Sequence, residues 1–217
     1  SSDLCARGFE QKEGIGYNEA FAPAAQWASA RIMLIMAVLL GLETKQIGYT
    51  AAFMQAPIEE EVFAEMPLRL RKEGKVWKLK RCIYGLKQAP RNFFIRATKQ
   101  LEQLGFTQSP AGPCLLISSE VIMLLYVDDG LLLARGKAAL KRLPGGMKMA
   151  GLHFGEEGSA AGYLGTHIGR KPGGTTHLTQ TGLAKRIATA LHLGSGTEAS
   201  SKVPCKGDLP EIGRAHV

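Results

Sequence analysis

Two adjacent carboxylates stand between two apolar runs in the middle of the chain. Asp128 and Asp129 follow the apolar and aromatic run 121–127 and precede Gly130 and the apolar run 131–134. Runs of this length are too short for a membrane span and are typical of buried strands. Asp and Gly at the junction indicate a tight hairpin with both carboxylates at its tip. Adjacent carboxylates favour a positive partner, and a divalent cation is the natural candidate.

The same residues also suit an ordinary hairpin turn, because short motifs recur without a function. The surrounding sequence favours the first interpretation. Residues 126–129 (YVDD), with their apolar flanks, resemble the active-site hairpin of reverse transcriptases. Residues 79–93 (LKRCIYGLKQAPRNF) resemble the block "LKKSLYGLKQAPRQW" of copia-type retrotransposon polymerases. Further matches follow in family order, so the resemblance covers about residues 4 to 193.

The resemblance implies an α+β polymerase fold with fingers, a palm built on a small antiparallel sheet, and the start of a thumb. We expect fingers over 1–45 and 58–82, and palm over 46–57 and 83–165, the latter with the catalytic hairpin and a primer-grip-like segment at 163–168. We expect the thumb to start in 166–193 and a disordered tail over 194–217. The implied activity is RNA-directed DNA synthesis from an RNA template, a DNA primer and deoxynucleotides, with Mg²⁺ or Mn²⁺ as cofactor.

The resemblance implies functions for individual residues. Asp128 is expected to be a metal ligand, and Asp129 a second acidic group at the same site. Residues expected to bind nucleotide or template are Phe53, Tyr84, Gly85, Lys87, Gln88, Arg91 and Arg7. Within this set, Phe53 matches the aromatic residue that blocks a ribose 2′-OH, and Arg7 matches a basic residue near the triphosphate. From the residues alone, Phe53 equally suits the core and Arg7 equally suits the surface.

One match fails at a catalytic position. The family segments "QMDVKTAFL" and "QIDYTAAF" align with residues 46–53, but Gly48 stands where they carry the first catalytic aspartate. Nucleotidyl transfer of this kind uses two metal ions about 4 Å apart. Glycine offers no side-chain oxygen, and the Tyr49 carbonyl does not replace the missing charge. A loss of about 10⁴-fold in rate corresponds to about 5 to 6 kcal/mol, so we expect little or no polymerase activity.

Three further glycines depart from the family pattern in the same way. Gly16, Gly112 and Gly151, like Gly48, stand where the family has aspartate. We expect the first three changes to remove turn or cap hydrogen bonds. Such a one-directional set indicates decay without selection for catalysis, and adaptation to a non-catalytic role is the rival explanation. A nucleic-acid-binding remnant and a functionless relic therefore both stay open as alternatives to an active polymerase.

Basic residues concentrate in one segment. Residues 69–99 contain eleven Lys or Arg and one acid, a local charge of +10 compared with +8 for the whole chain. Aromatic residues are interleaved with them, as in grooves that bind nucleic acid. A solvated basic face is the alternative. We expect phosphate contacts from Lys75, Lys78, Lys80, Arg81, Lys87 and Arg91.

Other patterns bound the remaining possibilities. Four scattered cysteines and five unpaired histidines predict neither a zinc site nor a disulfide framework. The apolar run 32–40 predicts a buried helix and no membrane span. The chain starts without methionine, which suggests a piece of a longer polyprotein. Helices are expected over 29–42 with Ser29 as N-cap and Gly41 as stop, from Pro90 to Gly105, over 137–143 ending at Pro144, and over 178–193.

Overall fold

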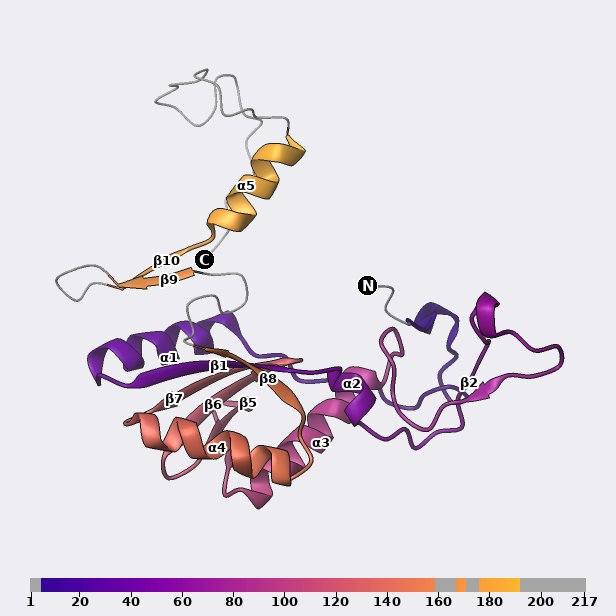
Figure 1. Cartoon of the computed structure of the whole chain (residues 1–217), viewed down its shortest axis with the longest axis horizontal. Helices are drawn as coiled ribbons and strands as arrows, with labels where there is room; N and C mark the ends of the chain where they lie inside the picture. The colour runs from indigo at the N-terminus through magenta and orange to yellow at the C-terminus, as the bar shows by residue number, and fades with distance from the viewer. Residues whose placement is uncertain (1–4, 159–166, 171–175, 192–217) are drawn as a thin grey trace, which may run out of the picture. The chain divides into compact units, whose positions relative to one another are not determined.

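Six antiparallel strands form the central sheet of the computed structural model, in the order β4-β5-β6-β7-β1-β8 (Figure 1). The structure describes residues 5–158, 167–170 and 176–191. The chain divides into two compact units, Ser1–Thr179, which contains the sheet, and Gln180–Val217. The expected tail over 194–217 and most of the primer-grip-like segment lie outside the described residues.

The strands are β1 (Glu43–Tyr49), β2 (Phe63–Ala64), β3 (Trp77–Lys78), β4 (Thr107–Ser109), β5 (Gly112–Ile117), β6 (Val121–Tyr126), β7 (Asp129–Ala134), β8 (Phe154–Gly158), β9 (His167–Arg170) and β10 (Thr176–Thr179). The helices are α1 (Trp27–Leu39), α2 (Ala52–Gln55), α3 (Ala89–Gln103), α4 (Lys137–Met149) and α5 (Thr181–Ala190), with short 3₁₀ turns η1 (Gly8–Glu10) and η2 (Leu68–Leu70). Two small hairpins, β2-β3 and β9-β10, stand apart from the central sheet.

Helices cover both faces of the central sheet. Side chains alternate between the faces along each strand, so neighbouring residues enter different cores. On one face, Leu124, Leu131 and Leu133 pack with buried residues of α1. On the other, Met123, Leu125 and Leu132 belong to the larger core that includes α3 and α4. Figure 1 shows α1 and α4 on opposite sides of the sheet. The centre of the sheet is therefore apolar on both faces, which explains why β6 and most of β7 are continuous apolar runs.

Two helix ends follow the glycine signals in the sequence. The backbone of Gly105 has φ +84° after α3, and the Phe106 N–H donates to the Leu101 carbonyl at 3.1 Å. Gly41 has φ +60° after α1, with the matching bond from Leu42. Glycine adopts this left-handed conformation without a Cβ penalty, so both predicted stops are confirmed.

Three other helix predictions were wrong in detail. The first helix begins at Trp27 with Gln26 as N-cap, so Ser29 lies inside it. The helix α4 continues through Pro144 to Met149. In α4, Leu140, Pro144 and Met147 are buried on one face, and this packing outweighs the cost of a proline inside a helix. The predicted helix over 178–193 is shorter, because 176–179 form β10.

Glycine at 151 suits its position. Gly151 follows α4 with φ +81°, and the Leu152 N–H donates to the Met147 carbonyl at 2.9 Å. A residue with a Cβ is strained in this conformation. Glycine itself therefore closes the helix, and the expectation that the change at 151 removes a hydrogen bond stays a prediction.

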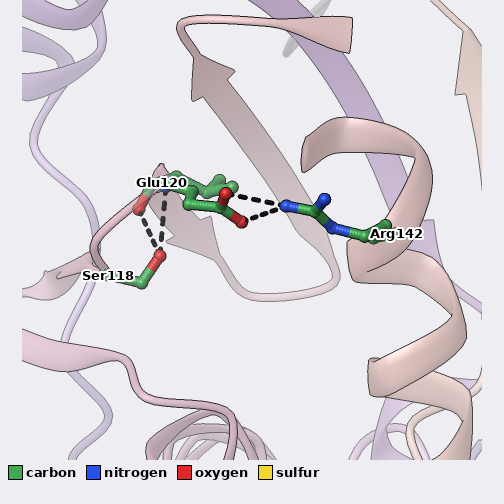
Figure 2. Close-up of polar contacts among 4 residues, drawn as sticks. Ser118, Glu120 and Arg142 are labelled. Carbon is green, nitrogen blue, oxygen red and sulfur yellow. Dashed lines mark hydrogen bonds and ion pairs between the residues drawn. The ribbon is translucent and has the colours of Figure 1, made fainter. Parts of the chain in front are cut away.

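A surface ion pair joins the β5-β6 turn to α4. In Figure 2, the Arg142 guanidinium donates to both Glu120 carboxylate oxygens, at 2.7 and 2.5 Å. The Ser118 hydroxyl bridges the Val121 N–H and carbonyl at 3.1 Å and closes the turn. The Glu120 carboxylate raises the pKa of Arg142. Both charged side chains are exposed, so the pair contributes little to stability.

Every helix within the described residues is too short or too polar to cross a bilayer. The apolar run 32–40 lies largely in α1, so the predicted helix is confirmed. The predicted burial is wrong for most of the run, because only Met33, Leu34 and Ala37 are buried. The exposed apolar residues are Ile32, Ile35, Val38, Leu39 and Leu40.

Candidate active site

The two carboxylates lie at the tip of the β6-β7 hairpin. Tyr126 and Asp129 are paired across the two strands, so the loop consists of Val127 and Asp128 alone. Val127 has φ +51°, a costly conformation for a β-branched residue. The predicted hairpin is confirmed, but its predicted turn was wrong. Asp129 begins β7, and Gly130 lies within it opposite Leu125.

Gly130 is inside the strand because its neighbours leave no space for a side chain. A Cβ added there would lie 2.8 Å from Cγ1 of Ile47 and 3.0 Å from Cε of Met123. Contacts this short do not occur at real Cβ atoms without a shift of the neighbours. The glycine therefore allows β7 to pack closely against β1 and β6. In the sequence, a glycine that is needed for packing looks the same as a glycine in a turn.

The β1 register places Gly48 beside the acidic pair. Gly48 is paired with Asp129 on β7 and with Gly155 on β8. Directly paired residues in antiparallel strands have Cα atoms about 4.5 to 5.5 Å apart and side chains on the same face. The Tyr49 N–H donates to the Asp128 carbonyl at 2.6 Å and holds the hairpin tip against β1. The structure therefore brings Gly48, Asp128 and Asp129 together.

This arrangement offers two side-chain carboxylates to a cation. Within the described residues, no group of three or more His, Cys, Asp or Glu side chains could hold a metal ion. Mg²⁺ in proteins is often held by one or two carboxylates together with waters and substrate phosphates. Asp128 and Asp129 are thus the carboxylates at this hairpin tip that could contribute to a cation site, and Gly48 adds none to them.

Two residues expected at the nucleotide site pack against each other. The rings of Phe53 and Tyr84 have centroids 4.5 Å apart, and the Phe53 and Phe93 centroids are 6.4 Å apart. Phe53 is only 8% exposed and belongs to the larger core. The position of Phe53 is thus compatible with both a core residue and a residue of the nucleotide site, because Phe53 belongs to the core and also contacts Tyr84.

Gly85 lies where two backbone segments meet. It has φ +91°, and a Cβ added there would lie 2.1 Å from the Ala6 carbonyl oxygen. The Ala6 N–H donates to the Tyr84 carbonyl at 2.7 Å. A Cβ at Gly8 would lie 1.9 Å from the Gly85 carbonyl oxygen. Glycine at 8 and 85 thus allows the amino-terminal segment to run directly alongside Tyr84.

Lys87 and Gln88 make hydrogen bonds within the protein. The Lys87 ammonium donates to the Gln11 carbonyl at 3.1 Å and lies 4.8 Å from the Tyr17 ring centroid. Gln88 is fully buried, and its amide donates to the Gly16 carbonyl at 2.9 Å. The Gln11 amide donates to both the Gln88 side-chain oxygen and the Gly16 carbonyl. These side chains fasten residues 11–17 to the start of α3.

Comparison with known proteins decides the family. Residues 1–204 match the family model described as reverse transcriptase (RNA-dependent DNA polymerase). The chain belongs to the reverse transcriptase family. The match spans most of the chain, including the β6-β7 hairpin and the block at 79–93.

Relatives place this reverse transcriptase domain among retrotransposons. The retrovirus-related Pol polyprotein from transposon TNT 1-94 of Nicotiana tabacum is 33% identical over 176 residues, which cover 77% of this chain and 13% of that polyprotein. The polyprotein from transposon RE1 of Arabidopsis thaliana is 34% identical over 58% of the chain and 9% of its own length. The transposon Ty1-GR1 Gag-Pol polyprotein of Saccharomyces cerevisiae is 30% identical over 48% of the chain and 6% of its own length. The chain thus spans a small part of these polyproteins.

The two arginines expected at the reverse transcriptase site form surface ion pairs. Arg7 lies 3.2 Å from the Glu10 carboxylate, and both side chains are exposed. Arg91 pairs with Glu19. The acidic partners of Arg7 and Arg91 are thus Glu10 and Glu19, which are not the hairpin carboxylates. Ion pairs at the protein surface are weak, so these two pairs contribute little to stability.

The basic segment of the domain is partly neutralised by its neighbours. Lys78 pairs with Glu61, and Arg71 lies 2.8 Å from Glu65. Arg81 donates to the Gln55 carbonyl at 2.9 Å. Local counter-charges thus reduce the phosphate-binding capacity that the sequence count suggests. Of the six cations expected to contact phosphates, Lys75 and Lys80 have exposed side chains that make no hydrogen bond or ion pair with the described residues.

Sequence reasoning missed two glutamines of this domain. Gln11 joins residues 11–17 to Lys87 and Gln88, and Gln55 joins the end of β1 to the start of β8. Neither has a local sequence signal, because a lone glutamine in a mixed stretch usually faces solvent. Their roles depend on residues 76 to 98 positions away.

Proposed function

We propose that this reverse transcriptase domain is an RNA-directed DNA polymerase domain of a copia-type element with little or no remaining activity. One observation carries the proposal: Gly48 is paired with Asp129, at the position where a third carboxylate would complete the site. In this assignment, β1, β6 and β7 belong to the palm, residues 58–82 to the fingers and α5 to the start of the thumb.

The proposed chemistry assigns distinct tasks to the residues around the hairpin. Asp128 and Asp129 would hold Mg²⁺ or Mn²⁺, which as a Lewis acid stabilises charge on the oxygens of a phosphoryl transfer. Phe53 and Tyr84, whose rings are in contact, would shape the site for the deoxynucleotide sugar. Gly85, which follows Tyr84 directly, would help to shape the same nucleotide pocket through its backbone. The exposed cations Lys75 and Lys80 would contact phosphates of the RNA template and DNA primer.

The size of the defect follows from the missing carboxylate. A shortage of about 5 to 6 kcal/mol in transition-state stabilisation corresponds to a rate about 10⁴-fold lower. Gly155, which is paired with Gly48 on β8, has no side chain and therefore adds no bulk beside position 48.

Primer extension on a primed RNA template tests the proposal. We expect the unmodified chain to extend primers at or near background, and Gly48→Asp to raise the rate by at least 100-fold at equal Mg²⁺. The matched control is Gly112→Asp, which adds the same carboxylate at the start of β5, where a Cβ has nothing within 4 Å. We expect no gain from the control.

Two results would contradict the proposal. The first is a Gly48→Asp protein that is folded by thermal melting, binds primed template and Mg²⁺, and still extends no primer. The second is an unmodified chain that extends primers at a rate close to the repaired one. In the second case another residue supplies the missing ligand, and the assignment of Gly48 is wrong.

A second candidate function is nucleic-acid binding without catalysis. The observation that favours it is the exposed, unpaired state of Lys75 and Lys80 within the described residues, in a domain that lacks the carboxylate at 48. We expect the affinity for a primed template to fall steeply with salt. Lys80→Ala should weaken binding more than Lys78→Ala, because Lys78 already pairs with Glu61. Equal effects, or binding that salt does not alter, would argue against this candidate.

A further inference from the structure

Gln55 is a buried polar side chain that hydrogen-bonds to the backbone at the ends of β1 and β8 that lie next to each other. It ends α2 and is 6% exposed. Its amide nitrogen donates to the Thr50 carbonyl at 2.8 Å and to the His153 carbonyl at 2.6 Å. Its amide oxygen accepts from the His153 N–H at 2.9 Å. One side chain thus satisfies three backbone groups.

The two segments that Gln55 joins carry residues next to the hairpin carboxylates. Thr50 follows directly after β1, and His153 directly precedes β8. The Thr50 N–H also donates to the His153 carbonyl at 3.1 Å, so the segments are held at this end by both backbone and side-chain bonds. Within the same two strands, Gly48 is paired with Gly155. Gln55 therefore closes the β1-β8 pairing two residues from the position opposite Asp129.

The backbone at Gln55 is also hydrogen-bonded to residues 81 and 82, which precede Tyr84. The Gln55 carbonyl accepts from the Arg81 guanidinium at 2.9 Å. The adjacent Ala56 carbonyl accepts from the Cys82 N–H at 3.1 Å. The segment that leads into Tyr84 is thereby connected to the same turn. A fully bonded polar network in a buried position fixes one arrangement of its members, since any other arrangement leaves polar groups unpaired.

We propose that Gln55 is a positioning residue that fixes the end of β1, and with it position 48, relative to Asp128 and Asp129. The inference deepens the proposed function and, for its catalytic part, rests on it. The amide is required for its chemistry, because only an amide both donates to the two carbonyls and accepts from the His153 N–H. Methionine has a similar length and makes none of these bonds.

Hydrogen exchange on the unmodified chain and on Gln55→Met tests the positioning without requiring activity. The informative amides are Thr50, which donates to the His153 carbonyl, and Tyr49, which donates to the Asp128 carbonyl. The matched control is Thr98→Val, which removes a 7% exposed hydroxyl that bonds within α3. We expect exchange at both amides to rise at least tenfold in Gln55→Met and less than threefold in the control.

Equal exchange in Gln55→Met and Thr98→Val at these amides would overturn the proposal, because the effect would then be general destabilisation. If Gln55→Met does not fold, Gln55→Glu is measured with the same thresholds. Glutamate keeps an acceptor for the His153 N–H but cannot donate to the two carbonyls when ionised.

Primer extension in the Gly48→Asp protein tests the catalytic consequence. Adding Gln55→Met should lower the maximal extension rate at least tenfold while the Kd for primed template changes less than threefold. Adding Thr98→Val should leave both within threefold. An unchanged rate with the glutamine replaced would overturn the catalytic part. If Gly48→Asp itself is inactive, the proposed function fails, whereas the exchange experiment still decides whether Gln55 positions β1.

Discussion

Tyr49 carries a buried hydroxyl without a hydrogen-bond partner among the described residues. The residue is 4% exposed, and its ring packs edge-on against Phe93, with centroids 5.2 Å apart. Burying an unpaired hydroxyl costs about 1 to 3 kcal/mol, and phenylalanine keeps the ring contacts. We therefore expect Tyr49→Phe to raise the free energy of unfolding by about 1 to 2 kcal/mol. For a domain of this size the melting temperature should rise by about 2 to 8 °C.

Alkaline pH should enlarge this difference. Burial raises the pKa of the Tyr49 hydroxyl above its usual range, so the folded protein keeps a proton that the unfolded chain releases above pH about 10. Where the folded state binds more protons, stability falls as pH rises. The unmodified protein should thus lose stability on the order of 1 kcal/mol at pH 11 relative to Tyr49→Phe. The difference between the two proteins should be independent of pH below about 9.

Urea denaturation of both proteins at pH 7.5 and at pH 10.5 to 11 measures these terms. Because both share every other titrating group, their difference isolates Tyr49. The matched control is Tyr17→Phe, whose hydroxyl accepts from the Lys87 ammonium at 3.4 Å, so its removal should bring no gain. A less stable Tyr49→Phe protein would show that the hydroxyl has a partner. A pH-independent difference up to pH 11 would refute the inference that Tyr49 is buried without one.

Three further predictions concern the backbone and the thiols. In urea denaturation, Gly85→Ala should lower the free energy of unfolding by about 2 to 5 kcal/mol and Gly14→Ala by only about 1 to 2 kcal/mol. Both glycines have positive φ, but only Gly85 lacks space for a side chain. Equal losses would contradict the close contact at Gly85. Ala51→Gly should stabilise the protein by about 0.5 to 1 kcal/mol, because Ala51 has φ +47°, and a loss in the same assay would count against the strain. Iodoacetamide at pH 8 should label exposed Cys5 at least 100-fold faster than Cys114, as measured by peptide mass spectrometry. The reason is that burial raises the pKa of the Cys114 thiol to about 11. Comparable rates would show that Cys114 is accessible.

Local signals in the sequence predicted the elements around the site. The two apolar runs flanking the acidic pair are β6 and β7, and the apolar spacing after Pro90 is α3. Gly41 and Gly105 end their helices as expected, because glycine at a helix end acts through its own φ angle and needs no distant partner. The family resemblance rested on contiguous motifs and is confirmed by the match over residues 1–204. The roles assigned to individual site residues stay predictions.

Long-range pairing decided the rest. The sequence could not show that Asp129 begins a strand or that Gly130 is needed for packing, because both depend on the register with β1 and β6. It could not show that Pro144 stays helical, since core burial opposes the local preference there. It assigned Lys87 to ligands, whereas the tertiary structure gives this side chain partners from residues 70 and 76 positions earlier. Composition determines which groups are able to bond, and only the fold determines which of them meet.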